Sequence, residues 1–225
     1  MRIIAIPDIH TRADILPELA EPLQQADLVL LAGDMTNGGN RGLAAMQNVL
    51  DTVHQFNSQV YSVPGNMDND DILQMTEGLG INIHRRHIIH EGVAICGLGG
   101  ALPFAGPFVF TEGELAAYLE ESIATIPEET PLILVSHQPP YGTICDQLSG
   151  GQHVGSHAVR AFIEAYQPLV CFSGHIHEAV GTDTIGQTVV INPGAYVQSQ
   201  SYAYAEIVDG ALITAEVRSK RASQP

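Results

Sequence analysis

Short, nearly uninterrupted apolar runs recur along most of this chain, and most of them are followed by a segment with the periodicity of an amphipathic helix. Strands that alternate with helices are typical of an α/β protein, and strands without alternating polar residues are expected to be buried on both faces. The predicted strands are residues 2–6, 27–32, 59–63, 132–136 and 169–172, and the predicted helices are residues 13–24, 43–56, 112–124 and 157–166. Thr111 and Glu114 predict a capping box at the start of the third helix.

The last fifth of the chain has a different pattern. Residues 188–191, 202–208 and 212–217 are short runs rich in β-branched and aromatic residues, separated by Gly and Asp, and they predict an antiparallel β region. The sequence contains no repeat, low-complexity linker or break in composition. We therefore expect a single domain over residues 1–225, with residues 218–225 as a frayed tail.

The charge balance is strongly acidic, because 9 Lys and Arg face 25 Asp and Glu and give a formal net charge of −16. Proteins that coat DNA or RNA need basic side chains to neutralise phosphates, so stable nucleic-acid binding is not expected. An anionic membrane surface would also repel this chain. The expected partner is a small molecule, and no sequence feature indicates an oligomeric state.

Apolar runs in this chain stay far below the about 18 residues that span a bilayer. The first run ends at Pro7, which makes it too short for the apolar part of a signal peptide. Cys96, Cys145 and Cys171 lack the close spacing of a zinc knuckle or a redox pair, so three free thiols in a reducing compartment are expected. These features together predict a cytoplasmic location.

Polar side chains that can bind metal follow each of the five predicted strands. The strands end in Asp8-Ile9-His10, Gly33-Asp34, Gly65-Asn66, Ser136-His137 and Gly174-His175-Ile176-His177. Each group has an ordinary interpretation by itself, since an Asp or Asn can form a turn or cap a helix and a His can be a hydrogen-bonded core residue. Ligands of open α/β sheets gather at the carboxyl ends of the strands, so the joint placement favours one common site. Asp8 and His10 are expected to project to the same side of an extended strand.

The types of these residues indicate a divalent metal. Four imidazoles, two carboxylates and one amide oxygen suit Mn, Fe, Zn, Ni or Co, and the lack of cysteine ligands argues against a closed structural zinc site. Seven side chains are too many for one ion. Two ions that share Asp34 would have about four protein ligands each, and the ions of two-metal sites lie about 3.5–4 Å apart. That arrangement suits phosphoryl chemistry.

The order of these motifs, D-x-H, G-D, G-N, H and G-H-x-H, resembles that of the calcineurin-like metallophosphoesterases. The resemblance extends from Asp8 to His177, and Asn192-Pro193-Gly194 is similar to a turn common in the phosphodiesterase branches of that family. It implies a four-layer α/β/β/α sandwich of two mixed sheets flanked by helices.

The resemblance also implies a ligand set and a mechanism. One ion would be held by Asp8, His10, Asp34 and His177, and the second by Asp34, Asn66, His137 and His175. A hydroxide that bridges the two ions would attack phosphorus in line, while the ions neutralise the phosphoryl oxygens. Asn66 is in addition a candidate for contact with the substrate.

The chain departs from the family at the residue after Asn66. Many members carry a histidine there that is thought to protonate the leaving group, whereas this chain has Met67, which cannot donate a proton. Asp68 is one candidate for the general acid, and a turn or capping residue is an equal alternative for it. His153, in the glycine-rich segment 151–156, is the preferred candidate, with substrate contact as an alternative to proton transfer.

The sequence therefore predicts a dinuclear metal-dependent phosphoesterase that hydrolyses small phosphodiesters, with cyclic and other nucleotide diesters as candidates. Hydrolysis of phosphomonoesters or phosphoproteins is the alternative enzymatic function. A non-catalytic scaffold with the same fold is a third hypothesis, against which the complete ligand set argues.

Overall fold

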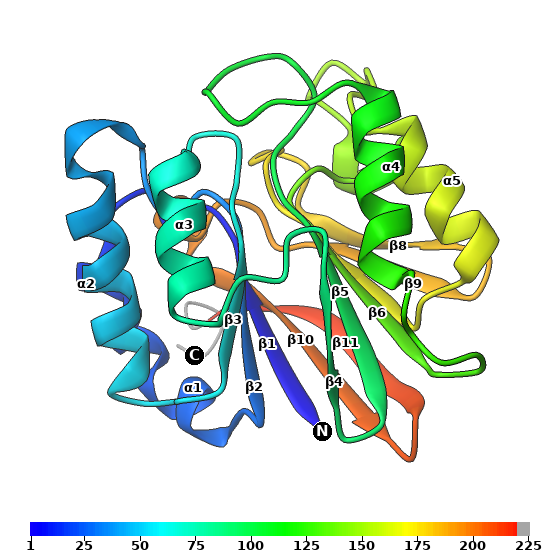
Figure 1. Cartoon of the computed structure of the whole chain (residues 1–225), viewed down its shortest axis with the longest axis horizontal. Coiled ribbons are helices and arrows are strands. Elements are labelled where there is room, and N and C mark those ends of the chain that lie inside the picture. The colour runs from blue at the N-terminus through cyan, green and yellow to red at the C-terminus, as the bar shows by residue number, and fades with distance from the viewer. Residues whose placement is uncertain (220–225) are drawn as a thin grey trace.

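The computed structural model describes residues 1–219 as two mixed β-sheets that pack face to face, with helices covering the outer face of each sheet (Figure 1). The predicted α/β class and the four-layer α/β/β/α arrangement are confirmed. Residues 220–225 of the predicted frayed tail lie outside the described residues.

The first sheet has the strand order β11-β10-β1-β2-β3. Its strands are β1 (Arg2–Ile6), β2 (Leu28–Ala32), β3 (Val60–Val63), β10 (Ser201–Val208) and β11 (Ala211–Ser219). β1, β2 and β3 are parallel, while β10 pairs antiparallel with both β1 and β11. Because β11 continues to Ser219 and pairs it with Ser201, residues 218 and 219 belong to a strand, and the prediction of a tail frayed from residue 218 is wrong for them.

The second sheet has the strand order β4-β5-β6-β7-β9-β8. Its strands are β4 (His87–His90), β5 (Val93–Leu98), β6 (Leu132–Ser136), β7 (Val170–Phe172), β8 (Gly181–Ile185) and β9 (Thr188–Asn192). β5, β6, β7 and β9 are parallel, and the edge strands β4 and β8 are antiparallel to their neighbours. The predicted antiparallel region is thus confirmed for β10 and β11. β9 lies in the other sheet, where it is antiparallel to β8 and parallel to β7.

Helices lie on both outer faces of the sandwich, with α2 and α3 at the left of Figure 1 and α4 and α5 at the right. They are α1 (Ala20–Gln25), α2 (Gly42–His54), α3 (Asp70–Gly78), α4 (Glu112–Ile123), α5 (His157–Tyr166) and the short α6 (Tyr196–Ser199). The capping box predicted at Thr111 and Glu114 is present at the start of α4. The helix predicted over residues 13–24 is instead a 3-10 segment, Ala13–Leu19, followed by α1. Pro17 and Pro22 lack the N–H groups that a continuous α-helix needs there.

Three apolar layers fill the spaces between the four layers of structure. On β1, Ile4 and Ile6 pack with the helices on one side, while Ile3 and Ala5 pack into the cluster between the sheets. The third cluster, which includes Leu134 of β6, packs α4 and α5 against the second sheet. Since every central strand contributes to two apolar layers, the absence of polar alternation in the predicted strands is explained, and their expected burial on both faces is confirmed.

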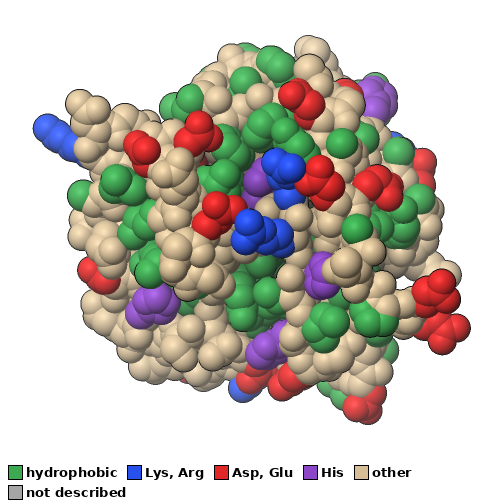
Figure 2. All heavy atoms as spheres, viewed as in Figure 1, with side chains coloured by type: hydrophobic (Ala, Val, Ile, Leu, Met, Phe, Trp, Pro, Cys, Tyr) green, Lys and Arg blue, Asp and Glu red, His purple; other side chains and the backbone are tan. Residues whose placement is uncertain are grey.

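Several basic side chains lie beside acidic ones at the surface. Figure 2 shows basic side chains beside acidic ones on the face drawn, without a continuous basic patch. Arg12 pairs with Asp14 at 2.7 Å, and Arg160 pairs with Glu164 at 2.8 Å. A search of the helices within residues 1–219 finds none with the length and apolar character needed to cross a membrane.

Candidate metal centre

The metal-binding side chains predicted from the sequence meet where the carboxyl ends of β1, β2 and β3 approach those of β6 and β7. Asp8 and His10 follow β1, Asp34 follows β2, and Asn66 follows β3. The second sheet contributes the remaining candidate ligands, His137 after β6 and His175 and His177 after β7. The centre is therefore built jointly by both sheets.

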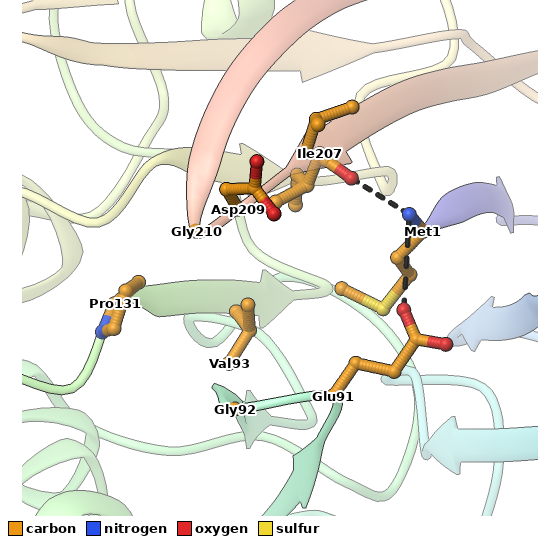
Figure 3. Close-up of a pocket in the computed structure, with 9 residues that line it drawn as sticks. Met1, Glu91, Gly92, Val93, Pro131, Ile207, Asp209 and Gly210 are labelled. Carbon is orange, nitrogen blue, oxygen red and sulfur yellow. Dashed lines mark hydrogen bonds and ion pairs between the residues drawn. The ribbon is translucent and has the colours of Figure 1, made fainter.

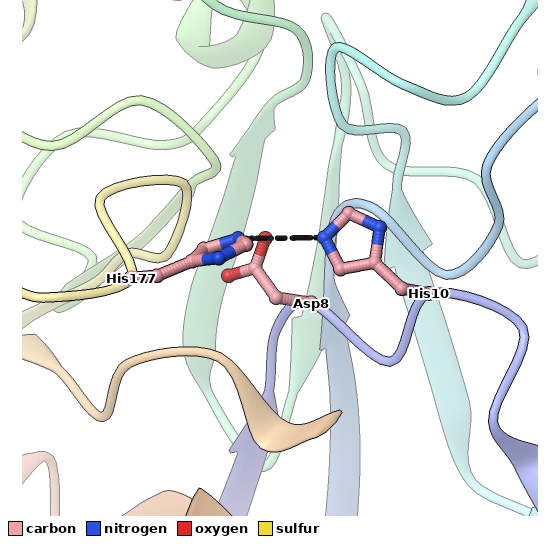
Figure 4. A group of neighbouring side chains, drawn as sticks. All are labelled: Asp8, His10 and His177. Atoms are coloured by element: carbon pink, nitrogen blue, oxygen red, sulfur yellow. Dashed lines mark hydrogen bonds and ion pairs between the residues drawn. The ribbon is translucent and has the colours of Figure 1, made fainter. Parts of the chain in front are cut away.

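One group of donors forms around Asp8 (Figure 4). Asp8 Oδ1 lies 3.3 Å from His177 Nε2 and 3.7 Å from His10 Nε2. The two histidine Nε2 atoms are 3.4 Å apart, and Figure 4 shows the Asp8 carboxylate between the two rings. These three residues form a group able to hold a metal ion, and Asp8 is fully buried.

A second group of donors forms around His137, which is fully buried. His137 Nε2 lies 3.0 Å from Asn66 Oδ1 and 3.6 Å from Asp34 Oδ2. Asp8, Asp34 and His137 form the second metal-compatible group of the structure. The ring of His175 is 5.2 Å from that of His137, so His175 borders this group.

Glycines directly before three ligands make room for ligands of the neighbouring strand. A Cβ atom at Gly33 would contact the His137 ring, and one at Gly65 would contact the Asp34 carboxylate. At Gly174 an added Cβ would lie 2.7 Å from Asp8 Oδ2. The glycines of the G-D, G-N and G-H motifs are therefore required because the strand ends approach closely at the centre.

The backbone at several ligands is left-handed, with φ of 56° at Asp8, 48° at His10, 55° at Asp34 and 65° at His175. The expectation that Asp8 and His10 converge as alternate residues of an extended strand is therefore wrong, since β1 ends at Ile6 and both residues turn. Hydrogen bonds from Asp8 N to Gly33 O (2.9 Å) and from His10 N to Asp34 O (3.0 Å) hold this conformation. Strained backbone of this kind concentrates at functional sites.

Second hydrogen bonds orient the imidazoles of the centre. His137 Nδ1 lies 2.9 Å from Ala32 O, which accepts only if that nitrogen carries a proton. His10 Nδ1 lies 2.7 Å from Asn37 Oδ1, and Gln198 contacts His177 Nδ1 at 3.3 Å. Sequence reasoning missed Asn37 and Gln198, because nothing in their spacing links them to the ligands. Orienting partners of this kind are typical of metal-ligating histidines.

The charges of the centre call for a cation between the donors. Because Nδ1 of His137 donates to a carbonyl, Nε2 of the neutral ring has a lone pair directed at the oxygens of Asn66 and Asp34. The lone pairs on the nitrogen and the oxygens repel one another unless a proton or a metal ion lies between the nitrogen and the oxygens. Burial by itself lowers the pKa of His137, but the carboxylate of Asp34 outweighs it and raises that pKa to about 9. The pKa of Asp34 is correspondingly lowered, against its burial. A divalent ion would supply positive charge in place of this proton, so the donor set fits a metal.

The pKa values of His175 and His177, the other two histidines of the second sheet, shift in opposite directions. Burial, together with the neighbouring His137, lowers the pKa of His175 to about 4, so its imidazole is neutral at neutral pH. The hydrogen bond with Asp8 raises the pKa of His177. A neutral imidazole is the form that binds metal, and His175 is already in that form.

The two candidates for the general acid lie in different surroundings. Asp68 is fully buried, and its oxygens accept hydrogen bonds from Gly65 N (2.9 Å), Thr36 N (3.0 Å) and Thr36 Oγ1 (2.8 Å). These contacts favour the turn-anchoring alternative for Asp68. The His153 side chain is 29% exposed, and its Nδ1 lies 2.8 Å from Asp146 Oδ1.

The three cysteines are free and buried, as predicted. Burial raises the pKa of both Cys96 and Cys145 to about 12, so neither forms a nucleophilic thiolate at neutral pH.

A pocket of about 540 Å³ lies at the opposite end of β1, lined in part by Met1, Glu91, Ile207 and Asp209 (Figure 3). The Met1 amino group donates to Ile207 O at 2.7 Å and lies 3.8 Å from Glu91. None of the candidate ligands lines this pocket, so this cavity is separate from the candidate metal centre.

Comparisons with known proteins agree with this fold and centre. A family model described as calcineurin-like phosphoesterase matches residues 1–179. MJ1162, an uncharacterised protein of Methanocaldococcus jannaschii, is 32% identical over 199 residues, which cover 86% of this chain and 88% of that protein. A UPF0046 protein of Caenorhabditis elegans is 26% identical over 219 residues, covering 85% of this chain and 69% of that protein.

Among solved structures, TT1561 of Thermus thermophilus superimposes with a TM-score of 0.69 at 18% identity, covering 97% of this chain and 98% of that one. Fold and centre together define a metal-binding α/β phosphoesterase. The chain belongs to the calcineurin-like phosphoesterase family. Membership supports hydrolysis of phosphoric esters, and the clusters around Asp8 and His137 are candidate ligand groups for divalent metal.

Proposed function

We propose that this protein is a dinuclear metal-dependent phosphodiesterase that hydrolyses small phosphodiesters, with cyclic and other nucleotide diesters as candidates. The position of Asp34 carries the dinuclear part of the proposal. Its Oδ2 atom lies 3.8 Å from His10 Nε2 and 3.6 Å from His137 Nε2, so one carboxylate oxygen stands between the two groups of donors. A ligand shared by two ions needs this intermediate position.

The family resemblance implies how the other six residues would divide around Asp34. Asp8, His10 and His177 would hold one ion, and Asn66, His137 and His175 the other. When bound, the ions supply Lewis-acid activation of water and neutralise charge on the phosphoryl oxygens. The side-chain amide of Asn66 is oriented for metal binding, because its Nδ2 donates to Ala105 O at 2.9 Å and its Oδ1 is thereby directed toward His137.

The residue after Asn66 supports a diester with a good leaving group. Met67 donates its backbone N–H to Asp34 Oδ1 at 2.7 Å, while its thioether side chain has no proton to give. Without a donor at this position, a leaving group that departs as a stable anion is favoured.

Reconstitution with single metals tests this proposal. Metal-free protein is loaded separately with Mn, Fe, Zn, Ni or Co and assayed with bis-aryl and mono-aryl phosphates at matched concentration. We expect activity that depends on added metal and a higher kcat/KM for the diester. A strong preference for the monoester would instead favour the phosphatase alternative, and absence of turnover with every ion would favour the scaffold.

His153 is the chain's best-placed candidate for moving a proton. Asp146 is fully buried and accepts hydrogen bonds from Thr143 N and Gly155 N, each at 2.8 Å, as well as facing His153 Nδ1. This carboxylate fixes the tautomer in which His153 Nε2 is the free ring nitrogen. The loop is fastened to the centre through Gln138, which follows His137 in sequence and donates to Val154 O at 3.1 Å.

Replacing His153 with alanine is expected to increase the dependence of rate on leaving-group pKa, because a proton donor matters most for poor leaving groups. Rates are measured with a series of diesters of graded leaving-group pKa, and bound metal is measured by elemental analysis. Metal content should stay unchanged. His54→Ala, at an exposed position of α2, is the matched control. An unchanged slope in His153→Ala would show that His153 donates no proton.

A further inference from the structure

The loop between β5 and α4 is fastened to two segments that carry metal ligands. Ala105 O accepts from Asn66 Nδ2 at 2.9 Å, and Leu102 N donates to Gln138 Oε1 at 3.0 Å. Asn66 is a ligand of the candidate centre, and Gln138 follows the ligand His137 directly. In Figure 1 this loop, drawn in green before α4, arches over the top of the molecule. Residues 102–108, which we call the rim loop, therefore border the centre.

The rim loop is held in one conformation by its backbone. Phe108 N donates to Asn66 O at 3.2 Å, so the loop contacts both the side chain and the backbone of this ligand. Gly106 has φ of +82°, and a Cβ atom there would contact Asn66 O. Pro103 and Pro107 fix the backbone on either side of the tip.

The base of the loop is anchored in an aromatic cluster. The rings of Phe108 and Phe110 lie 4.9 Å apart, and the buried His84 ring lies 5.5 Å from Phe108. His84 Nδ1 in turn accepts from Gly99 N at 2.8 Å, just before the loop. Motion of the tip relative to Asn66 is restricted by these contacts.

Phe104, at the tip of this restrained loop, is 92% exposed and is the most exposed large apolar side chain among residues 1–219. Burial of a phenyl ring is ordinarily favourable, and the described fold does not supply that burial here. Phe104 directly precedes Ala105, whose carbonyl accepts a hydrogen bond from Asn66, so the backbone of Phe104 lies on the Asn66 side of the centre.

We propose that Phe104 binds the organic part of the substrate by stacking on a planar aromatic group, such as a nucleobase, of the ester bound at the metal centre. This inference rests on the proposed function. The ions would bind the phosphate, so the rest of the substrate needs other contacts. On the Asn66 side the rim offers an exposed aromatic ring, and aromatic stacking accepts any base because every base has a π face.

Equilibrium binding of two phosphate monoesters to the full chain loaded with Mn²⁺ tests the inference. Adenosine monophosphate and methyl phosphate share the phosphate and differ in the planar base, and calorimetry gives both affinities. Wild-type protein should bind the adenine compound more tightly. Phe104→Ala should weaken that affinity by roughly tenfold or more, which corresponds to the usual effect of losing one stacked base, and should leave methyl phosphate unchanged. Phe104→Trp should restore the preference.

Leu79→Ala, at a side chain 54% exposed after α3, is the matched control and should change neither affinity. Equal binding of the two ligands by the wild type, failure to bind either, or an equal loss for both in Phe104→Ala would overturn the inference. Thermal unfolding of each variant verifies that the exposed substitution leaves the fold intact. If the protein hydrolyses diesters in the metal screen but binds both ligands equally, the role of Phe104 is refuted and the proposed function stands. If the protein hydrolyses no ester with any metal in that screen, the proposed function is refuted.

Discussion

Replacing Asp34 with asparagine is expected to lower kcat/KM for a bis-aryl phosphodiester by about 1000-fold, since losing several kcal/mol of charge stabilisation has that effect on a rate. The neutral amide cannot supply the negative charge that both donor groups share. Its oxygen can still accept from Met67 N, which donates to Asp34 Oδ1 in the native chain, so the loop should keep its shape. Steady-state kinetics and elemental analysis of bound metal provide the measurement.

Asp51→Asn is the control for this change of charge. Asp51 lies on α2, is exposed, and accepts from Gln47 at 2.7 Å, away from the centre. Its substitution should leave rate and metal content unchanged. If Asp34→Asn kept activity within tenfold of the wild type and bound the same amount of metal, the role of Asp34 as shared ligand would be refuted.

Asp68→Ala is expected to reduce the free energy of unfolding by roughly 3–5 kcal/mol, because buried donors would lose their charged acceptor. Gly65 N, Thr36 N and Met35 N all donate to this carboxylate, which ties the loop after β2 to the loop after β3. Urea unfolding of the metal-free protein gives the measurement. Asp71→Ala, at an exposed position in the first turn of α3, should cost far less.

The pH dependence of the free energy of unfolding provides a second test of the buried Asp68 carboxyl group. Burial and the nearby Asp34 carboxylate raise the pKa of Asp68 to about 6, so the folded chain holds this proton to higher pH than the unfolded chain does. The stability contributed by the protonated form is therefore complete below about pH 4 and is lost as pH rises through 6. The unfolding free energy of wild type minus that of Asp68→Asn should fall across this range. A constant difference would contradict the raised pKa.

The same Asp68→Asn variant separates anchoring from proton donation. If Asp68 were the general acid, the variant would slow diesters with poor leaving groups far more than those with good ones. Anchoring predicts an equal change across the series, and the fully buried carboxylate favours that outcome.

The candidate ligands could be grouped from the sequence because each of them lies shortly after an apolar strand, at the edge of the sheet where strand ends meet. What the sequence could not indicate was the local conformation, since the left-handed backbone at Asp8 and His10 depends on hydrogen bonds to Gly33 and Asp34 of another strand. Asn37 and Gln198 were missed for the same reason: their contacts with the histidines arise only from folding.

The strands missed from sequence are of two kinds. β4 and β8 are short edge strands that begin or alternate with polar residues, and so they lack the long apolar run used to find the central strands. β5 is fully buried but contains Gly97, which suggests a loop when considered alone. In the fold a Cβ at Gly97 would lie 2.7 Å from Val63 Cγ1, so the glycine is needed where the two sheets approach each other.

The candidate ligands follow strands of both sheets. Those after the first sheet are Asp8, His10, Asp34 and Asn66, and those after the second are His137, His175 and His177. Each ion in the proposed arrangement would thus be a cross-link between two layers otherwise joined by apolar packing. Binding to the folded chain alone adds a stabilisation that grows with the logarithm of free metal concentration. The resistance of this protein to unfolding would then report the metal supply of its surroundings, and a chain starved of metal would be easier to open and degrade.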